Sequence, residues 1–208
     1  MFITFEGVEG SGKTSQVQVL GVALLRRGVT TTLTREPGGS PIGAPLRSIL
    51  LSDQYAVCPR AELLLYAAER AEHVERVIRP ALGRGEWVLC DRYGDATRAY
   101  QAWGRGIPRS EVELVHALAT GGLEPDLTVL LRVPVEFALS RARHRDGLNP
   151  SGEGRFEAED LTFHRRVAEG YEALALENPA RFVVVEATGT REEVAGRVWS
   201  ALEGRLVL

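Results

Sequence analysis

Residues 7–14 read Gly7-Val8-Glu9-Gly10-Ser11-Gly12-Lys13-Thr14, which fits the pattern G-x-x-x-x-G-K-[ST] of a phosphate-binding loop. A short β-prone run, Phe2–Phe5, precedes the loop, and a largely apolar, helix-like stretch follows it at 13–27. The glycines let backbone N–H groups turn toward phosphate oxygens, and the helix N-terminus adds a favourable dipole. This strand–loop–helix context makes the pattern a credible nucleotide site, whereas a chance match in a glycine-rich turn is the alternative.

Two side chains of the loop have expected roles in this chemistry. Lys13 is expected to reach the β and γ phosphates of a nucleoside triphosphate, and the Thr14 hydroxyl is expected to ligate Mg²⁺. The predicted ATP-binding residues are Gly7, Val8, Glu9, Gly10, Ser11, Gly12, Lys13, Thr14 and Ser15.

The size and charge of the chain narrow its class. Its 208 residues correspond to one ordinary domain, expected to span 1–208, and a net charge of −3 argues against a nucleic-acid or membrane-surface partner. No apolar run approaches the ~20 residues of a membrane span, and no signal peptide precedes the first strand. Cys58 and Cys90 lack metal-ligand spacing and suggest no disulfide framework, which fits a cytoplasmic protein.

Five β-rich runs alternate with longer helical patterns along the chain. The predicted strands are Phe2–Phe5, Val29–Thr34, Trp87–Cys90, Leu127–Val133 and Arg181–Val185. The predicted helices lie at about 13–27, 60–82, 111–120, 134–145, 159–176 and 190–204. This alternation predicts an α/β fold with a five-stranded, mostly parallel sheet and helices on both faces. Because ligands of such sheets bind at the carboxyl ends of the strands, the residues after each strand are expected to form the site.

The residues that follow the predicted strands are polar. Thr34-Arg35-Glu36-Pro37-Gly38-Gly39 follows the second strand, and Asp91-Arg92-Tyr93 follows the third. Asp91 comes after an apolar run and suits an acidic residue that holds Mg²⁺, with a helix N-cap as the alternative role. The segment at about 143–157 is rich in arginine, histidine and glycine, and we interpret it as a mobile lid rather than a simple solvated loop.

Four arginines are expected to meet in one cleft: Arg35, Arg47, Arg70 and Arg92. Guanidinium groups match phosphate oxygens bidentately, so together they suit a second phosphate, although a surface ion pair is the alternative for any one of them. Tyr66 lies four residues before Arg70, hence on the same helix face, and a ring beside a guanidinium suits a nucleobase. Tyr66 in the core is the alternative. Phosphoryl transfer to an acceptor is favoured over hydrolysis, because no switch-like glutamine or Walker B extension stands out. The lid-like segment also carries arginines that can neutralise charge on a transferring phosphoryl group: Arg141, Arg143, Arg145 and Arg155.

Taken together, these motifs resemble the thymidylate kinase family over nearly the whole chain. The resemblance rests on 5–14, 34–39, 46–48, 67–73, 91–93, 99–101, 104–106 and 125–128. The Arg-Glu-Pro-Gly-Gly and Asp-Arg-Tyr pieces, in this order, are far more specific than the phosphate-binding loop. The resemblance implies a P-loop NTPase fold with a lid, phosphorylation of dTMP to dTDP by ATP with Mg²⁺ in dTTP synthesis, and a homodimer.

The resemblance also implies a role for individual acceptor-site residues. Glu9 resembles the acid that contacts the sugar 3′-hydroxyl of dTMP, and Tyr100 resembles the ring packed against the sugar. Arg70 resembles the contact to a thymine carbonyl. The ligands of the dTMP phosphate correspond to Arg35, Arg47 and Arg92; the remaining substrate-binding positions are Pro37, Tyr66 (where the family usually stacks a Phe), Thr97 and Gln101 as partners of the base edge.

The same resemblance locates the catalytic arginine in the lid. Some family members carry a basic residue inside the phosphate-binding loop, whereas position 10 here is glycine. Arg155, in Gly154-Arg155-Phe156-Glu157, best matches the lid pattern Asp-Arg-x-Glu, and Arg141 and Arg143 are the next candidates. The predicted catalytic set is Lys13, Arg155, Arg92 and Arg143. Arg132 stands where the family commonly has Asp.

Two other functions use the same motifs. A kinase for another deoxynucleotide or nucleoside would share the scaffold and differ in its acceptor. A nucleotide-dependent switch would hydrolyse slowly and need no acceptor, so the arginines and the lid segment count against it.

Overall fold

The computed structural model of the chain describes residues 1–148 and 154–206, with the side chains of 145–148 left aside. All five expected strands are present: β1 (Phe2–Glu6), β2 (Thr31–Arg35), β3 (Trp87–Asp91), β4 (Leu127–Arg132) and β5 (Phe182–Glu186). They form one sheet in the order β2-β3-β1-β4-β5, and every neighbouring pair is parallel. The carboxyl ends of all five strands therefore lie at one edge.

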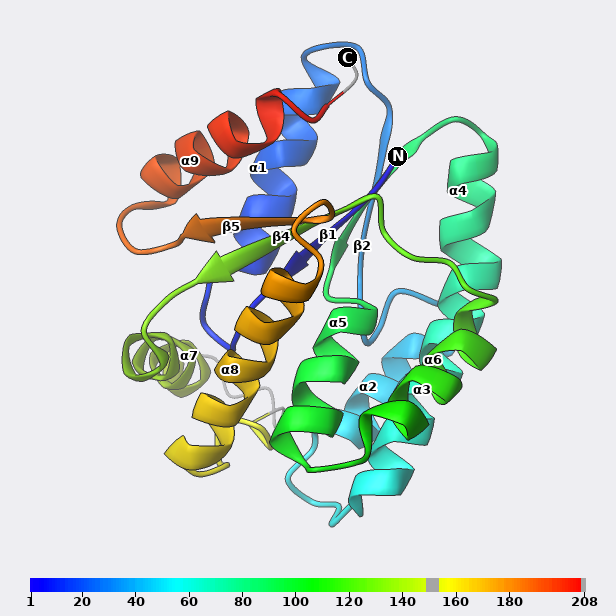
Figure 1. Cartoon of the computed structure of the whole chain (residues 1–208), viewed down its shortest axis with the longest axis vertical. Coiled ribbons are helices and arrows are strands. Elements are labelled where there is room, and N and C mark those ends of the chain that lie inside the picture. Colours follow the sequence, from blue (N-terminus) through cyan, green and yellow to red (C-terminus); the bar gives the residue numbers. More distant parts are fainter. Residues whose placement is uncertain (149–153, 207–208) are drawn as a thin grey trace.

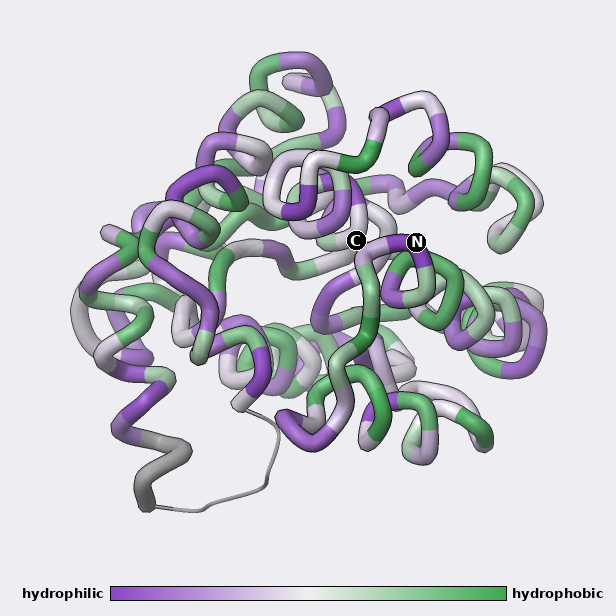
Figure 2. Tube along the Cα trace, turned by 90° about the horizontal axis from the view of Figure 1, so that it is seen from below, coloured by the Kyte–Doolittle hydropathy of each residue, from purple (hydrophilic) through white to green (hydrophobic). Residues whose placement is uncertain are grey.

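Helices cover both faces of the sheet, as the alternating pattern predicts (Figure 1). α1 (Lys13–Leu25) and α9 (Arg191–Glu203) pack together on one face. The other helices are α2 (Gly43–Leu51), α3 (Pro59–His73), α4 (Arg79–Gly83), α5 (Gly94–Thr97), α6 (Arg109–Thr120), α7 (Val135–Leu148) and α8 (Leu161–Glu177). In Figure 2 apolar and polar stretches alternate along the outer helices, as amphipathic helices require.

The central strand β1 is buried on both faces, and its side chains alternate between an apolar face and a face with polar residues. Ile3 and Phe5 are fully buried in the cluster that includes α1. Thr4 and Glu6 point to the opposite face, where Thr4 pairs with Thr128 and Glu6 accepts a hydrogen bond from α8. A strand buried on both sides normally reads as continuously apolar, so these two buried polar residues mark the face that carries the site.

Two helical segments differ from the expected pattern. The stretch predicted as one helix at 60–82 contains a π-helical turn, Val74–Ile78, between α3 and α4. Pro80 follows that turn, and since proline has no N–H to donate, a widened turn is one way to carry the helix past it. The helix formed by α5 and the π-helix η2 (Arg98–Gly104) was not predicted at all. Its glycine ends and mixed composition give no clear period.

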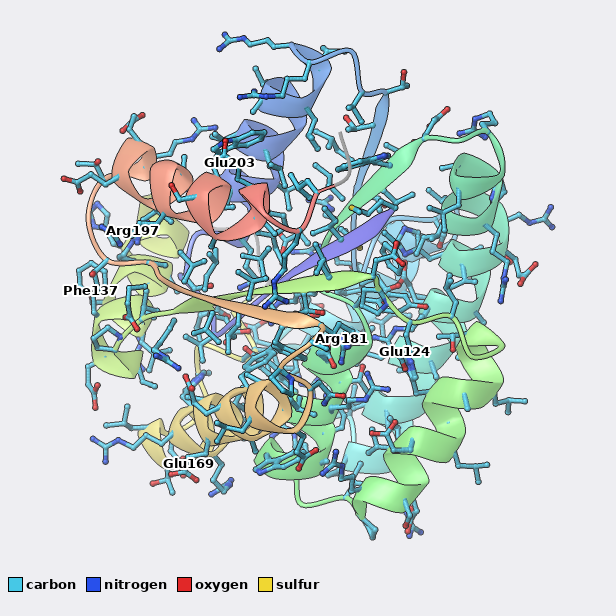
Figure 3. The ribbon with its side chains drawn as sticks, turned by 45° about the horizontal axis from the view of Figure 1, so that its top comes forward. Glu124, Phe137, Glu169, Arg181, Arg197 and Glu203 are labelled. Atoms are coloured by element: carbon cyan, nitrogen blue, oxygen red, sulfur yellow. The ribbon has the colours of Figure 1, made fainter. Side chains whose placement is uncertain are left out.

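A buried ion network anchors η2 to the sheet (Figure 3). Asp95 is 1% exposed and accepts from Arg98 at 3.0 Å and from Arg181, at the start of β5, at 2.9 Å. Arg98 also pairs with Glu113 of α6 at 3.0 Å and with Glu124 at 2.7 Å. Removing one partner of a buried pair leaves an uncompensated charge, so this network holds the helix firmly in place.

The expected lid overlaps the end of α7, and residues 149–153 lie outside the described part of the chain. After them, 154–160 form turns that lead into α8, whose N-cap Asp160 accepts from the backbone N–H of Phe163. Within the described residues, no helix is both long and apolar enough to cross a lipid bilayer.

Candidate active site

A cavity of about 290 Å³ lies at the carboxyl ends of β1, β2 and β3. It is lined by the phosphate-binding loop, by the segments after β2 and β3, and by α3 and η2. The ten residues predicted to bind the acceptor all line it: Glu9, Arg35, Pro37, Arg47, Tyr66, Arg70, Arg92, Thr97, Tyr100 and Gln101. The structure therefore brings together residues that are up to 92 positions apart in the sequence.

The phosphate-binding loop closes one end of the cavity. Lys13 donates to the backbone carbonyl oxygens of Gly7 at 3.1 Å and Val8 at 2.8 Å, and burial together with the nearby Arg92 lowers its pKa to about 8. A Cβ at Gly10 would lie 2.0 Å from the carbonyl oxygen of Ala138 in α7. The packing of α7 therefore excludes any side chain at position 10, including a basic one.

The predicted metal ligands meet where α1 begins beside β3. The Thr14 hydroxyl donates to Oδ2 of Asp91, so the two side chains are adjacent. A hydroxyl and a carboxylate are both hard oxygen ligands of the kind that Mg²⁺ prefers. The residue types and their adjacency fit a magnesium site at the phosphate end of the cavity, whereas the alternative role of Asp91 as a helix N-cap has no support, because Tyr93 precedes α5 and makes no side-chain cap.

Arg92 is held in a constrained backbone conformation, with φ at 70°. Its own N–H bonds to the carbonyl of Phe5 at 3.0 Å, and the next N–H, of Tyr93, bonds to the carboxylate of Glu6 at 2.7 Å. A non-glycine residue in the left-handed region persists only when its surroundings fix it. These two bonds tie the strained turn to the end of β1.

The guanidinium group of Arg92 makes four hydrogen bonds. It donates to the carbonyl of Gly7 at 3.0 Å, to the Tyr171 hydroxyl at 3.1 Å, and to Glu9 at 2.9 Å. The fourth reaches the Tyr100 hydroxyl at 3.2 Å, which itself donates to Glu9. Burial raises the pKa of Glu9, but the nearby Arg92 and Lys13 outweigh it and lower that pKa, so this acid is a carboxylate at neutral pH.

The base-side end of the cavity is built around Arg70, which is 1% exposed. Its Nε donates to Glu36 at 2.7 Å, while its Nη2 donates to Thr97 at 2.8 Å and to the carbonyl of Tyr93 at 3.2 Å. Glu36 also pairs with Nδ1 of His73 at 2.8 Å. Because both oxygens of Glu36 are occupied, the cluster is a support for Arg70 rather than an open cation site.

The other acceptor-side residues border the same space from the segment after β2 and from α3. Arg47 donates to the carbonyl of Pro37 at 3.0 Å, and Arg35 is exposed at the end of β2. Tyr66 is half-buried, and burial raises the pKa of its hydroxyl, with Glu62 adding to the effect. Tyr66 therefore lines the cavity while it also packs against the edge of the hydrophobic core.

The structure does not bring the predicted lid arginines into the cavity. Arg155 donates to the carbonyl of Leu50 at 2.7 Å and to the carboxylate of Glu62, neither of which lines the cavity. Arg143 is exposed and reaches the carbonyl of Glu157 at 3.4 Å. Of the predicted ATP-binding residues, Glu9, Gly10, Lys13 and Thr14 line the cavity, whereas five lie outside the lining: Gly7, Val8, Ser11, Gly12 and Ser15.

Several supporting residues were not predicted from the sequence. They are the buried residues Glu6, Glu36, Glu62, His73 and Tyr171. Glu36, Glu62 and Tyr171 bond directly to Arg70, Gln101 and Arg92, whereas His73 is linked to the site through Glu36 and Glu6 through Tyr171. Tyr171 follows the apolar i, i+4 spacing of α8 and so resembles a core residue. The one sequence feature that could have indicated these supporting residues is the presence of glutamates within otherwise apolar or helical runs.

The fold and the site define a P-loop NTPase whose nucleotide loop opens into a second, arginine-lined site. Residues 5–198 match the family model of thymidylate kinase. The chain is 52% identical to a thymidylate kinase of Trichlorobacter lovleyi, over 100% of this chain and 99% of that protein. It is 50% identical to one from a Synechococcus species, over 100% and 97%.

A solved structure agrees with these sequence matches. The crystal structure of thymidylate kinase from Ehrlichia chaffeensis superposes with a TM-score of 0.77 at 33% identity, covering 97% of this chain and 98% of that one. The chain belongs to the thymidylate kinase family.

Proposed function

We propose that this protein transfers the γ-phosphoryl group of ATP to dTMP, giving dTDP and ADP for dTTP synthesis. The observation that carries the proposal is a single cavity that is lined both by Lys13 and Thr14 of the phosphate-binding loop and by four arginines, Arg35, Arg47, Arg70 and Arg92. Such a space places an acceptor phosphate next to a donor γ-phosphate. Phosphoryl transfer needs this positioning and charge stabilisation more than a protein nucleophile.

The acceptor phosphate is assigned to Arg35, Arg47 and Arg92, because all three line the cavity and Arg92 bonds to Gly7 and Glu9 of the phosphate-binding loop. Glu9 and Tyr100 are assigned to the sugar, since the hydrogen bond between them joins the loop to η2 where both residues line the cavity. Tyr66, Arg70, Thr97 and Gln101 are assigned to the base, with Pro37 packed beside them.

Lys13 and a lid arginine are assigned to the transferred phosphoryl group. The lysine acceptors are backbone carbonyls, and phosphate oxygens are stronger acceptors for an ammonium group. Arg155 has first place among the lid arginines because of its sequence pattern, and Arg143 is second. For Arg155 to act, its guanidinium must leave Glu62.

Thr14 and Asp91 are the residues that would hold Mg²⁺. When bound, the ion neutralises charge on the phosphate oxygens that it touches. The two side chains themselves fix a pair of oxygen ligands at the phosphate end of the cavity, and Asp91→Asn is expected to weaken the dependence on magnesium.

The proposed quaternary state is a homodimer that pairs through α3 and α6. These helices pack on each other and leave large leucines in solvent: Leu64 is 58% exposed, Leu114 72% and Leu118 86%. An apolar patch of this kind suits a partner surface. Sedimentation at the mass of one 22.8 kDa chain would contradict this proposal.

The free thiols of Cys58 and Cys90 accord with a cytoplasmic location.

An acceptor panel tests the activity. The purified protein is incubated with ATP and Mg²⁺ together with dTMP, dUMP, dCMP, AMP or thymidine, and the products are separated. Formation of dTDP with the highest kcat/KM for dTMP is expected. A preference for thymidine would contradict the assignment of the arginines to an acceptor phosphate, and ATP hydrolysis without any acceptor would favour a nucleotide switch.

A further inference from the structure

Glu62, in the first turn of α3, is a fully buried carboxylate with three side-chain partners. Its Oε1 accepts from Nε2 of Gln101 at 2.8 Å and from Nε of Arg105 at 3.2 Å. Its Oε2 accepts from Nη2 of Arg105 at 3.1 Å and from Arg155. Glu62 itself does not line the cavity, but Gln101 does.

The Gln101 amide can satisfy Glu62 in only one orientation. A carboxylate that takes hydrogen bonds from two guanidinium groups offers acceptors alone, whereas a glutamine amide has an NH₂ end and a carbonyl end. The NH₂ end must therefore face Glu62, as it does in the structure. The carbonyl oxygen, Oε1, is then left on the cavity side, and none of the described residues donates a hydrogen bond to it.

Arg70 offers the complementary group on the same cavity. Its Nε and Nη2 are used by Glu36, Thr97 and Tyr93, and its Nη1 has no hydrogen-bond partner among the described residues. Gln101 and Arg70 thus present one acceptor and one donor to the same cavity.

One acceptor beside one donor matches one kind of pyrimidine. In a pyrimidine with N3–H beside a C4 carbonyl, the N3–H donates to the Gln101 oxygen and the carbonyl accepts from Arg70. A 4-aminopyrimidine edge has a bare N3 beside an NH₂ group. Its N3 would face the Gln101 oxygen, acceptor to acceptor, and its NH₂ group would face the Arg70 N–H, donor to donor, so the buried polar groups would stay unpaired. A site built to hydrogen-bond one pattern rejects the other strongly, because unpaired buried groups are costly.

We propose that Glu62 is a specificity-determining positioning residue, which fixes the Gln101 amide so that the site accepts 4-oxopyrimidine nucleotides and rejects 4-aminopyrimidine nucleotides. The inference rests on the proposed function, because it assigns the base to Gln101 and Arg70. Glu62 acts through Gln101 and touches no substrate.

The test compares dUMP with dCMP, which differ only at this edge of the base. The wild-type ratio of kcat/KM for dUMP over dCMP is expected to be at least about 10²-fold. Glu62→Gln is expected to lower that ratio about tenfold or more, because a glutamine at 62 can donate as well as accept and lets the Gln101 amide turn over. Any effect on the lid through Arg155 applies to both acceptors and cancels in the ratio.

A matched control removes a different carboxylate from the same arginine. Glu159 accepts from Arg105 at 2.6 Å and has no bond to Gln101. Glu159→Gln should leave the ratio unchanged, and an equal loss in both variants would overturn the proposal. In a Gln101→Leu background, Glu62→Gln should have no further effect on the ratio. A further effect there would also overturn it, because Glu62 would then act by another route.

A measurement on the wild-type protein covers the case in which Glu62→Gln does not fold. The side-chain NH₂ protons of Gln101, followed by NMR, should be protected from exchange with and without dTMP. Rapid exchange in the protein alone would overturn the proposal. If wild type phosphorylates no pyrimidine nucleotide, the proposed function fails. If it phosphorylates dTMP while the ratio in Glu62→Gln equals that of wild type, only the role of Glu62 fails.

Discussion

Two arginines, Arg92 and Arg155, are about equally buried but have hydrogen-bond partners in different places. The side chains are 17% and 12% exposed, so burial does not distinguish them. Arg92 bonds to Glu9 and Tyr100, which line the cavity. Arg155 bonds to Glu62 and to a backbone carbonyl, outside the lining. The acceptor-side group is thus already positioned, and the lid-side group has another partner.

This difference shows that two arginines predicted from sequence motifs can differ in whether their side chains already face the cavity. The turn around Arg92 is fixed by backbone bonds to the end of β1, so binding an acceptor there needs little reordering. The segment around Arg155 must exchange one set of partners for another before its charge can reach a phosphate. Substitution of Arg92, which is already positioned, and of Arg155, which must change partners, should therefore have different effects.

The largest effect is expected from Arg92→Lys. An ammonium group cannot replace a guanidinium group that makes four hydrogen bonds, and it leaves Glu9 and the acceptor phosphate poorly paired. We expect kcat/KM for dTMP to fall about 10³-fold, on the order of 4 kcal/mol, with KM for ATP little changed. Steady-state kinetics with each substrate varied in turn measures the effect.

Arg132→Lys is the matched control for this substitution. Arg132 pairs with Glu172 at 2.6 Å and Glu186 at 3.0 Å, and both pairs are exposed and outside the cavity. Its kinetics should stay within about twofold of wild type, since exposed pairs contribute little. Equal losses in the two variants would mean that Arg92 has no special place in the acceptor site.

An intermediate effect is expected from Arg155→Ala. If the arginine reaches the phosphoryl group only in the transition state, kcat should fall about 10²-fold while the Kd of dTMP stays unchanged. Single-turnover kinetics and dTMP titration measure the two quantities. A lower Tm with normal kcat would instead make Arg155 a structural partner of Glu62, and a loss confined to Arg143→Ala would transfer the catalytic role to Arg143.

The smallest effect is expected from Tyr171→Phe. The Tyr171 hydroxyl accepts from Arg92 at 3.1 Å and donates to Glu6 at 2.9 Å, so the change removes a bridge and keeps the ring. Loss of one such bond is worth about 1 kcal/mol, and we expect KM for dTMP to rise about fivefold with kcat and KM for ATP unchanged. A fall in kcat alone would contradict a role for Tyr171 in positioning Arg92.

Part of the acceptor side was predictable because Arg35, Pro37 and Arg92 lie in short motifs at strand ends. The runs around Arg35, Arg92 and the loop at 7–14 are each local, and a parallel sheet brings the carboxyl ends of its strands to one edge. Once the five strands are assigned, the meeting of these motifs follows from topology. The prediction that the four arginines meet in one cleft was therefore confirmed, whereas their role in binding an acceptor stays a prediction.

The sequence by itself determined the strands and the phosphate-binding loop, because these depend on local pattern, and its resemblance to one family named most of the residues that line the cavity. Only the tertiary structure decided which buried groups support them. Glu6 meets Tyr171 across 165 positions, and Glu62 meets Gln101 across 39 and Arg155 across 93. A buried polar group must find a partner wherever packing provides one, and no local period records that choice.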